Sequence, residues 1–351
     1  MTTTDEVEIV VEDDLETIYA EFRSRGWSDG LPIIPPTPER VARMLASSTD
    51  AEASLGSVPP SFAPALVRKA AVSAVMAGCI PEFFPAVTAA IGAVIQPDFN
   101  LGGVQSTTSS TAPMLIFNGP AAQAMGISGG VDCLGGSHHA NATVGRAVRL
   151  ALIALGGATP GVGDLATLGQ PAKISCCLAE NETQSPWRPL SEDRGFAPGA
   201  STVTAFASTG VIEVRDSDSQ SAQDLLTTIA HSMTPAGYMS ANNAGEKRPE
   251  ALVLMTPDHA RQVDGQGMTK DDARQFLWAR ARRPLTDFAE PVAAQVAGWR
   301  RERGVDTRDV TVTLTPDDVH IVVAGGSGAK SMFVPTWGGW TQSTTVEVTV
   351  S

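Results

Sequence analysis

The chain has few cysteines and few aromatic residues, and it lacks a cluster of basic residues. Four cysteines in 351 residues do not form a disulfide framework, and the adjacent Cys176 and Cys177 cannot easily meet the geometry of a disulfide with each other. Lys and Arg number 25 against 38 Asp and Glu, so the net charge is −13. Because nucleic-acid binding depends on clustered Lys and Arg that neutralise phosphates, we expect no nucleic-acid partner.

Long apolar runs and strong cofactor motifs are also missing. The longest apolar stretch, 83–95, contains Pro85 and is shorter than the roughly 20 residues that a spanning helix needs. The acidic, Thr-rich start at 1–14 lacks the basic and apolar parts of an export signal. We therefore expect a cytoplasmic protein without a membrane partner. The CxxC, HExxH and phosphate-loop patterns are absent, so we predict no metal and no cofactor.

Strand and helix patterns alternate along the chain, which predicts an α/β fold with mixed sheets and covering helices. The order helix, strand, short helix, helix, strand occurs twice, at 85–95, 114–117, after Pro120, 142–155 and 174–178, and again at 222–233, 251–255, after Pro257, 270–282 and 320–324. This order predicts two related lobes with a cleft between them. Residue identity between the halves is slight, so the alternative is a chance match of two α/β segments.

The remaining patterns complete the predicted organisation. We expect helices at 14–25, at 65–77, at 288–303 and after Thr37, paired strands at 202–208 and 211–215, and a final strand at 345–350. The chain then divides into a helical and proline-rich arm at 1–65, a first α/β lobe at 66–215 and a second α/β lobe at 216–351.

A glycine-rich polar loop at 129–141, directly before the predicted helix, is the first candidate for a functional site. It contains Cys133, Ser137 and two of the five histidines, and a helix N-terminus attracts anions. His138 and His139 are the candidate catalytic bases; on an extended backbone they point to opposite sides, so one of them would face a given pocket. Asn141 is a favourable N-cap and a candidate substrate-binding residue.

Two arginines of the same helix are candidate anion-binding residues. Arg146 and Arg149 lie off the apolar stripe and three residues apart, where they could bind an anionic or nitro-bearing substrate. The alternative is that both are solvated surface residues.

Further candidates lie in the strand at 174–178 and near the end of the chain. Cys177 is a candidate nucleophile, although nearby carboxylates raise a thiol pKa and the alternative is a small buried hydrophobe. Glu180 is a candidate general base. Trp337 and Trp340 would form the walls of a site for a flat ligand, or an aromatic plug in the core.

Several stretches together resemble a sparsely characterised bacterial family. They are Asp-Gly-Leu-Pro at 29–32 with Pro-Pro-Thr at 35–37, Ala-Val-Met-Ala-Gly-Cys at 74–79 with Pro-Glu at 81–82, Ala-Asn-Ala-Thr-Val-Gly-Arg at 140–146, and Ala-Glu-Asn-Glu at 179–182 with Ser-Pro-Trp at 185–187. The family comprises long subunits that accompany a short protein with a Cys- or selenocysteine-Gly-Ser-Cys motif. Its members have a Cys in the place of Cys177, whereas Arg is usual in the place of His139 and an apolar residue in the place of Cys176.

This resemblance implies a second, shorter protein subunit as a partner. It also implies a two-component hydrolase, of the kind that removes the methoxy group of an electron-poor nitroaromatic ether such as dinitroanisole. We therefore expect a small-molecule hydrolase that cleaves a carbon–heteroatom bond in xenobiotic degradation. The alternatives are a thiol-dependent redox component and a non-catalytic scaffold subunit for the short partner.

Overall fold

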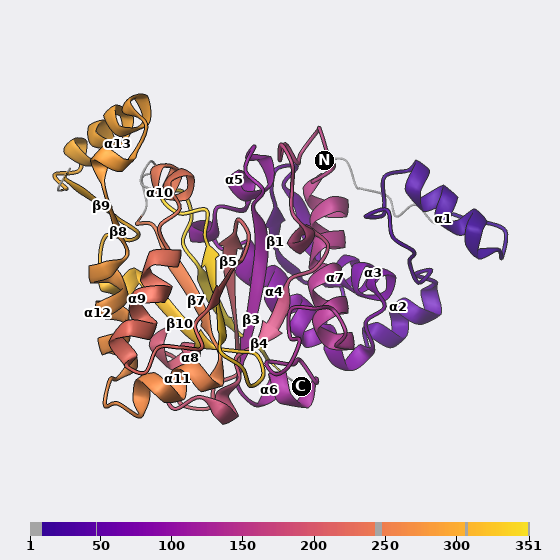
Figure 1. Cartoon of the computed structure of the whole chain (residues 1–351). Helices are drawn as coiled ribbons and strands as arrows, with labels where there is room; N and C mark the ends of the chain where they lie inside the picture. The colour runs from indigo at the N-terminus through magenta and orange to yellow at the C-terminus, as the bar shows by residue number, and fades with distance from the viewer. Residues whose placement is uncertain (1–8, 47, 243–247, 306–307, 350–351) are drawn as a thin grey trace.

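The computed structural model describes residues 9–46, 48–242, 248–305 and 308–349. Its centre consists of two four-stranded mixed sheets that lie face to face, with a layer of helices on the outer side of each sheet. Figure 1 shows this order of layers from α9 and α12, across the two sheets, to α7 and α3. The predicted α/β class with mixed sheets is confirmed.

The first sheet has the strand order β12-β5-β3-β4. Its strands are β3 (Ala112–Asn118), β4 (Cys177–Ala179), β5 (Thr202–Ser208) and β12 (Thr344–Glu347). β3 runs parallel to β4 and antiparallel to β5, and β12 is antiparallel to β5.

The second sheet repeats this arrangement in the order β10-β7-β11-β6. Its strands are β6 (Ile212–Arg215), β7 (Ala251–Met255), β10 (Val319–Val323) and β11 (Lys330–Pro335). β7 is parallel to β10 and antiparallel to β11, and β6 is antiparallel to β11. The two sheets therefore match strand for strand: β3 with β7, β4 with β10, β5 with β11, and β12 with β6.

Helices cover the outer face of each sheet. α3 (Val67–Ala77), α4 (Phe84–Val94) and α7 (His139–Gly156) pack on the outer face of the first sheet. α9 (Ala222–Ser232), α11 (Pro257–Asp264) and α12 (Lys270–Arg280) pack on the outer face of the second sheet. In chain order α4 matches α9, α7 matches α12, and α11 matches the short helix at Pro120–Ala124. The predicted repeat of elements is thus present in the structure, where each half supplies three strands of one sheet and the helices that cover it.

A third apolar core fills the space between the sheets. It combines inner-face residues of both sheets: Met114, Ile116, Cys176, Leu178, Phe206, Leu252, Leu254, Val322 and Val334, together with Cys133, Leu190 and Ala324. Because successive side chains of a strand point to opposite faces, the neighbouring residues Leu115 and Cys177 belong instead to the core under α7. Strands buried on both faces are apolar throughout rather than alternating.

The chain crosses between the sheets at two matching points. After β5 it continues into β6 of the second sheet, and after β11 it continues into β12 of the first sheet. At the crossing, Ser208 pairs with Thr336. Thr209 N–H donates to the Pro335 carbonyl (2.8 Å) and Trp337 N–H donates to the Ala207 carbonyl (2.7 Å), so the two segments exchange equivalent hydrogen bonds.

These crossings correct one prediction about strand pairing. The predicted pair 202–208 and 211–215 does not form, because β5 and β6 belong to different sheets. The short connection at 209–211 resembles a hairpin turn in sequence, but the chain passes through it to the other layer. β6 and β12 therefore lie in the sheets opposite to those of the segments 66–215 and 216–351 that contain them.

The remaining elements surround these layers. They are α1 (Leu15–Ser24), α2 (Pro38–Met44), the hairpin β1 (Ser54–Val58) and β2 (Ala63–Leu66), α5 (Leu101–Ser106), α6 (Pro120–Ala124), α8 (Leu190–Asp193), α10 (Ala236–Asn242), α13 (Glu290–Glu302) and the pair β8 (Arg282–Pro284) and β9 (Asp309–Thr311). The described residues also form the 3-10 turns η1 (Pro81–Phe83), η2 (Pro97–Phe99), η3 (Pro171–Lys173), η4 (Glu182–Gln184), η5 (Leu285–Asp287) and η6 (Pro316–Asp318). The side chains of Asp14 and Thr37 cap the N-termini of α1 and α2. In the part of the chain that is described, we find no helix that could span a membrane.

Candidate functional site

The glycine-rich loop is held to α7 by residues that were predicted to act on a substrate. α7 begins at His139 with His138 as its N-cap, so the prediction of Asn141 as the N-cap is wrong. Asn141 is the third residue of the helix and lies in its first turn. It donates to the carbonyls of Ser128 (2.8 Å) and Cys133 (3.0 Å) and accepts from Ser128 N–H (2.8 Å). Asn141 therefore anchors the loop, because its side-chain amide bonds both the N–H and the carbonyl of Ser128, as a neighbouring backbone segment would.

The two histidines face different parts of the chain. His138 Nε2 lies 2.8 Å from the carbonyl of Val131, within its own loop. His139 Nε2 lies 2.9 Å from the carbonyl of Gly78, which caps α3, and its ring packs edge-on against Phe83 at 5.2 Å between ring centres. His138 thus stabilises its own loop, whereas His139 joins the start of α7 to the end of α3, and the two side chains contact different parts of the chain.

The two arginines of α7 also have partners within the chain. Arg146 makes a paired contact with the Asp29 carboxylate at 2.7 and 2.9 Å and donates to the Pro32 carbonyl at 2.8 Å. Through this contact it fastens the proline-rich arm to α7. Arg149 instead contacts the carboxylate of Asp164 at 3.2 Å.

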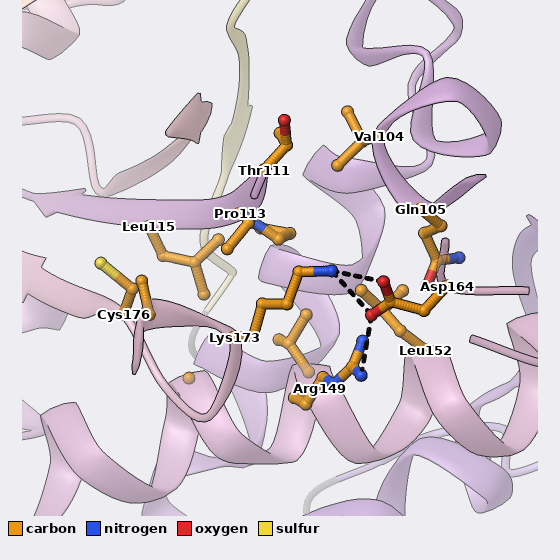
Figure 2. A pocket seen from close by; sticks show the side chains of 14 residues that line it. Val104, Gln105, Thr111, Pro113, Leu115, Arg149, Leu152, Asp164, Lys173 and Cys176 are labelled. Carbon is orange, nitrogen blue, oxygen red and sulfur yellow. Dashed lines mark hydrogen bonds and ion pairs between the residues drawn. The ribbon is translucent and has the colours of Figure 1, made fainter. Parts of the chain in front are cut away.

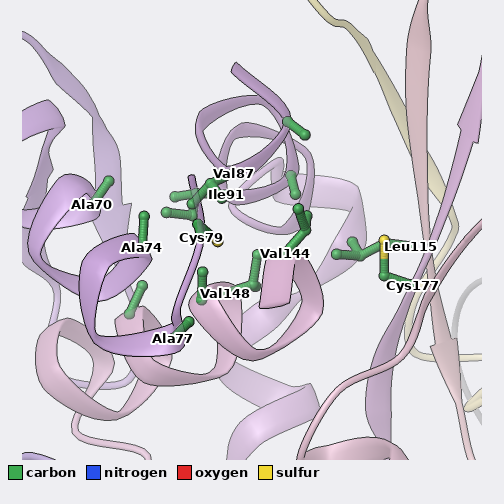
Figure 3. Packing of buried hydrophobic residues seen from close by; sticks show 14 of the residues in the cluster. Ala70, Ala74, Ala77, Cys79, Val87, Ile91, Leu115, Val144, Val148 and Cys177 are labelled. Atoms are coloured by element: carbon green, nitrogen blue, oxygen red, sulfur yellow. The ribbon is translucent and has the colours of Figure 1, made fainter. Parts of the chain in front are cut away.

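All four thiols are buried. Figure 3 shows Cys79 and Cys177 among the apolar side chains between α3, α4, α7 and the first sheet. Burial raises the pKa of Cys79 and Cys176 to about 12, and it also raises the pKa of Cys133 and Cys177. Since the thiolate is the nucleophile, this environment gives Cys177 the character of a small apolar residue.

Glu180 lies at the carboxyl end of β4, in a buried polar cluster. It accepts from the Asn118 amide (2.7 Å) and from Leu190 N–H (2.7 Å). Burial raises the pKa of Glu180, against the opposing charge of Lys270 and these two hydrogen bonds. Trp337 packs against the core of the first sheet, and Trp340 is exposed at the surface. The predicted candidates are therefore spread over several places in the fold.

A charged network that the sequence patterns did not predict as a site borders a cavity. The cavity has about 350 Å³ of space for the centres of water-sized molecules, and its lining includes Arg194, Glu250, Ser343 and Asp98. Glu250 directly precedes β7, and His320 is the second residue of β10. The sequence signal was present, because an acidic residue beside one apolar strand and a histidine within another must find partners when the strands are buried.

Glu250 is the centre of this network. Its carboxylate accepts from His320 Nε2 (3.0 Å), Ser343 N–H (2.6 Å) and the Ser343 hydroxyl (2.7 Å). Arg194 lies 3.5 Å from Glu250, donates to the Ser343 hydroxyl, and lies over the Phe206 ring at 5.7 Å. A carboxylate can only accept, so His320 donates from Nε2.

The charges of the network follow from these contacts. Burial by itself would raise the pKa of Glu250, but four effects lower it to about 2: the hydrogen bond of His320, the positive charge that this ring carries once it is protonated at low pH, the charge of Arg194 and the hydrogen bond of the Ser343 hydroxyl. Burial and the charge of Arg194 lower the pKa of His320, against the effect of Glu250. At neutral pH the network thus holds an ionised carboxylate, a guanidinium and a neutral imidazole. This arrangement can bind an electron-rich oxygen at Arg194 and exchange a proton with a ligand.

The described residues contain no group of three or more His, Cys, Asp or Glu side chains arranged to hold a metal ion. Comparison of the chain with models of known protein families finds no match, and comparison with curated proteins finds none either.

The lowered pKa of Glu250 predicts a pH dependence of stability. In the unfolded chain Glu250 has its ordinary pKa of 4.5, so its contribution is complete above pH 4.5 and is lost as the pH falls toward 2. We expect Glu250→Gln to lower the free energy of unfolding at pH 7. Between pH 4.5 and 2, that free energy should fall less steeply in the variant, by up to about 1.4 kcal/mol per pH unit.

Denaturant unfolding at a series of pH values measures this difference. The control is Glu347→Gln, which changes an exposed carboxylate of β12. Parallel curves for the wild type and Glu250→Gln over this pH range would contradict the assignment of Glu250 as an ionised, paired group.

The burial of the thiols predicts slow alkylation. A pKa of about 12 in place of 9 reduces the thiolate fraction of Cys79 and Cys176 at pH 8 about 1000-fold. We expect iodoacetamide to leave all four cysteines unmodified in the native protein and to label all four in guanidinium. Mass spectrometry of the peptides measures the label, and rapid labelling of Cys177 in the native protein would restore it as a nucleophile.

Proposed function

We propose that the chain is the substrate-binding subunit of a two-component hydrolase, and that its substrate is an electron-poor aromatic ether. The observation that carries this proposal is the cavity of about 350 Å³ with Arg194 and Glu250 in its lining. Its size is within the range of small-molecule sites in proteins. The resemblance to the long subunits that accompany a short thiol-motif protein supports the class of reaction.

The proposed reaction needs charge stabilisation and the transfer of a proton. Water adds to the ether, the carbon–oxygen bond breaks, and the products are an aryl oxide anion, a proton and methanol. Arg194 stabilises the negative charge that develops on the nitro and aryl oxide oxygens. Glu250 and His320 form a coupled pair that takes up the proton of the attacking water. No redox step is involved.

The buried thiols support a division of the chemistry between two chains. Thiolate chemistry at Cys177 is opposed by its burial among apolar residues and by its raised pKa. In the proposed complex, any reactive thiol therefore belongs to the short partner. This chain supplies the cavity and the charged network.

The connection between α7 and β4 is the surface on which we expect the partner to bind. It exposes Val162, Leu165, Leu168 and Ile174, and Leu168 is 95% exposed. The loop is nevertheless held in place: Thr167 N–H donates to the Thr108 carbonyl (2.9 Å), and the Gln170 amide donates to the carbonyls of Ser110 (2.5 Å) and Ser208 (2.8 Å). Exposed apolar side chains on an ordered loop are typical of an interaction surface.

The activity is tested with the chain and a short Cys-Gly-Ser-Cys-motif protein expressed together. We expect the pair to convert 2,4-dinitroanisole to dinitrophenolate and methanol without a reductant, with oxygen from ¹⁸O-labelled water in one product. Arg194→Met should lower kcat/KM by about 100-fold, as expected for the loss of one charge-stabilising donor. Arg215→Met, which changes an exposed arginine of β6, is the matched control.

Two outcomes would contradict this function. A requirement for a dithiol or a nicotinamide would exclude a hydrolase. An unchanged rate in Arg194→Met would place the chemistry outside the cavity and support the scaffold alternative.

The docking surface is tested separately from catalysis. We expect the double variant Leu165→Ser and Leu168→Ser to lose the complex with the short partner, because it removes the apolar contact area while leaving the loop's hydrogen bonds in place. Val211→Ser removes an exposed apolar side chain between β5 and β6 and should retain the complex. Size-exclusion chromatography with light scattering measures the assembly, and an intact complex in the double variant would show that the partner binds elsewhere.

A further inference from the structure

A second, smaller cavity lies between α7, α5, the start of β3 and the segment before β4. Figure 2 shows its charged side chains from close by, with Lys173 and Arg149 both directed at Asp164. The cavity offers about 30 Å³ of space for the centres of water-sized molecules. One water needs about 10–15 Å³ by this measure, so the space suits a ligand of a few atoms.

The charges around this cavity do not balance. Lys173 Nζ contacts both oxygens of Asp164, at 2.6 and 2.7 Å, and Arg149 contacts the same carboxylate at 3.2 Å. Asp164 is the only acidic residue among those that line the cavity, against two cations. All three side chains are largely buried, with exposed fractions of 7% for Asp164 and 15–16% for the cations. A partly buried site with one excess positive charge favours an anionic ligand.

Unpartnered polar atoms provide a second, independent observation. Gln105 Oε1 and Thr111 Oγ1 are buried and have no hydrogen-bond partner in the described structure. Both residues line the cavity and are at least 96% buried as whole residues. The Gln105 amide nitrogen is already bound to the Pro59 carbonyl, which leaves Oε1 as an acceptor without a donor. A ligand that suits this site must therefore offer a donor as well as a negative charge.

We propose that this cavity binds a small monovalent oxyanion, whose charged oxygens accept from Lys173 and Arg149 and whose own hydroxyl, or an attached water, donates to Gln105. Hydrogencarbonate combines both features in four heavy atoms. Formate and nitrite supply the charge and depend on a water for the donor. The proposal does not depend on the catalytic function, because neither cavity shares a lining residue with the other.

The ligand connects three segments that are distant in sequence. Gln105 belongs to α5, Arg149 to α7, and Lys173 to the turn before β4. An anion bound by these residues ties the loop that carries Asp164 to the body of the first lobe. Its binding should therefore raise the thermal stability of the protein.

Thermal unfolding and isothermal titration calorimetry test the site with sodium hydrogencarbonate, formate, nitrite and chloride at constant ionic strength. In the wild type we expect a saturable rise in Tm, largest for hydrogencarbonate, and a 1:1 binding isotherm. Lys173→Met removes the excess positive charge, so the rise in Tm and the isotherm should disappear. Lys330→Met removes a lysine from an exposed pair with Glu213 and should keep both.

Thr111→Val tests the neutral part of the site with a side chain of similar shape. It should weaken hydrogencarbonate binding at least 5-fold, while Thr88→Val, on α4, leaves the binding unchanged. Absence of a saturable effect with every anion in the wild type would mean that the cavity holds water only, and the proposal would be overturned. An identical isotherm in Lys173→Met would overturn it as well, and neither outcome bears on the activity of the two-component enzyme.

Discussion

Packing of the two sheets against each other is the constraint on which the rest of this structure depends. Each sheet has helices on one face. Its other face is also apolar and must be buried away from water. The residues Phe206, Leu252 and Leu178 belong to one shared core between the sheets. Since this layer forms only when both halves are present, each half needs the other to complete its burial.

The crossings of the chain follow from the same constraint. β6 and β12 each complete the sheet of the opposite half, and the hydrogen bonds of Thr209 and Trp337 join the two crossing segments. The halves are thereby linked through edge strands as well as through the apolar layer. Each edge that the exchanged strand covers would otherwise present unpaired backbone groups.

The sequence predicted the elements of this fold better than their partners. The helices at α4, α7, α9 and α12 and the strands at β3, β7 and β10 were found, because their apolar patterns are local. The pairing of β5 with β6 was wrong, because nothing in the two residues Thr209 and Gly210 indicates that the chain passes to another layer. Pairing across layers depends on segments that are far apart in sequence.

The same difference between local patterns and distant partners explains which parts of the candidate site the sequence predicted. The sequence shows that Arg146 and His139 are polar residues on a helix, but their partners Asp29 and Gly78 come from distant segments. Glu250 and His320 were visible as charged or titratable residues at apolar strands. They were not predicted as site residues because the glycine-rich loop contains a denser group of reactive side chains. Residue type alone does not reveal which group borders a cavity.

The repeat within the fold gives a reason to connect Glu250 and His320 with function. Glu180 N–H donates to Phe117 in the first sheet as Ala324 N–H donates to Met255 in the second, so the two sheets can be aligned residue by residue. By this alignment Glu250 corresponds to Ala112, and His320 corresponds to Cys176.

In the first sheet the corresponding positions are thus occupied by Ala112 and Cys176, and both residues are buried. Apolar replacement of a buried ion pair is often neutral or stabilising, so stability does not require the charged network. The architecture itself tolerates an apolar pair at this place. The buried Glu250 carboxylate and its partner His320 therefore call for another explanation, and binding of a polar ligand in the adjoining cavity supplies one.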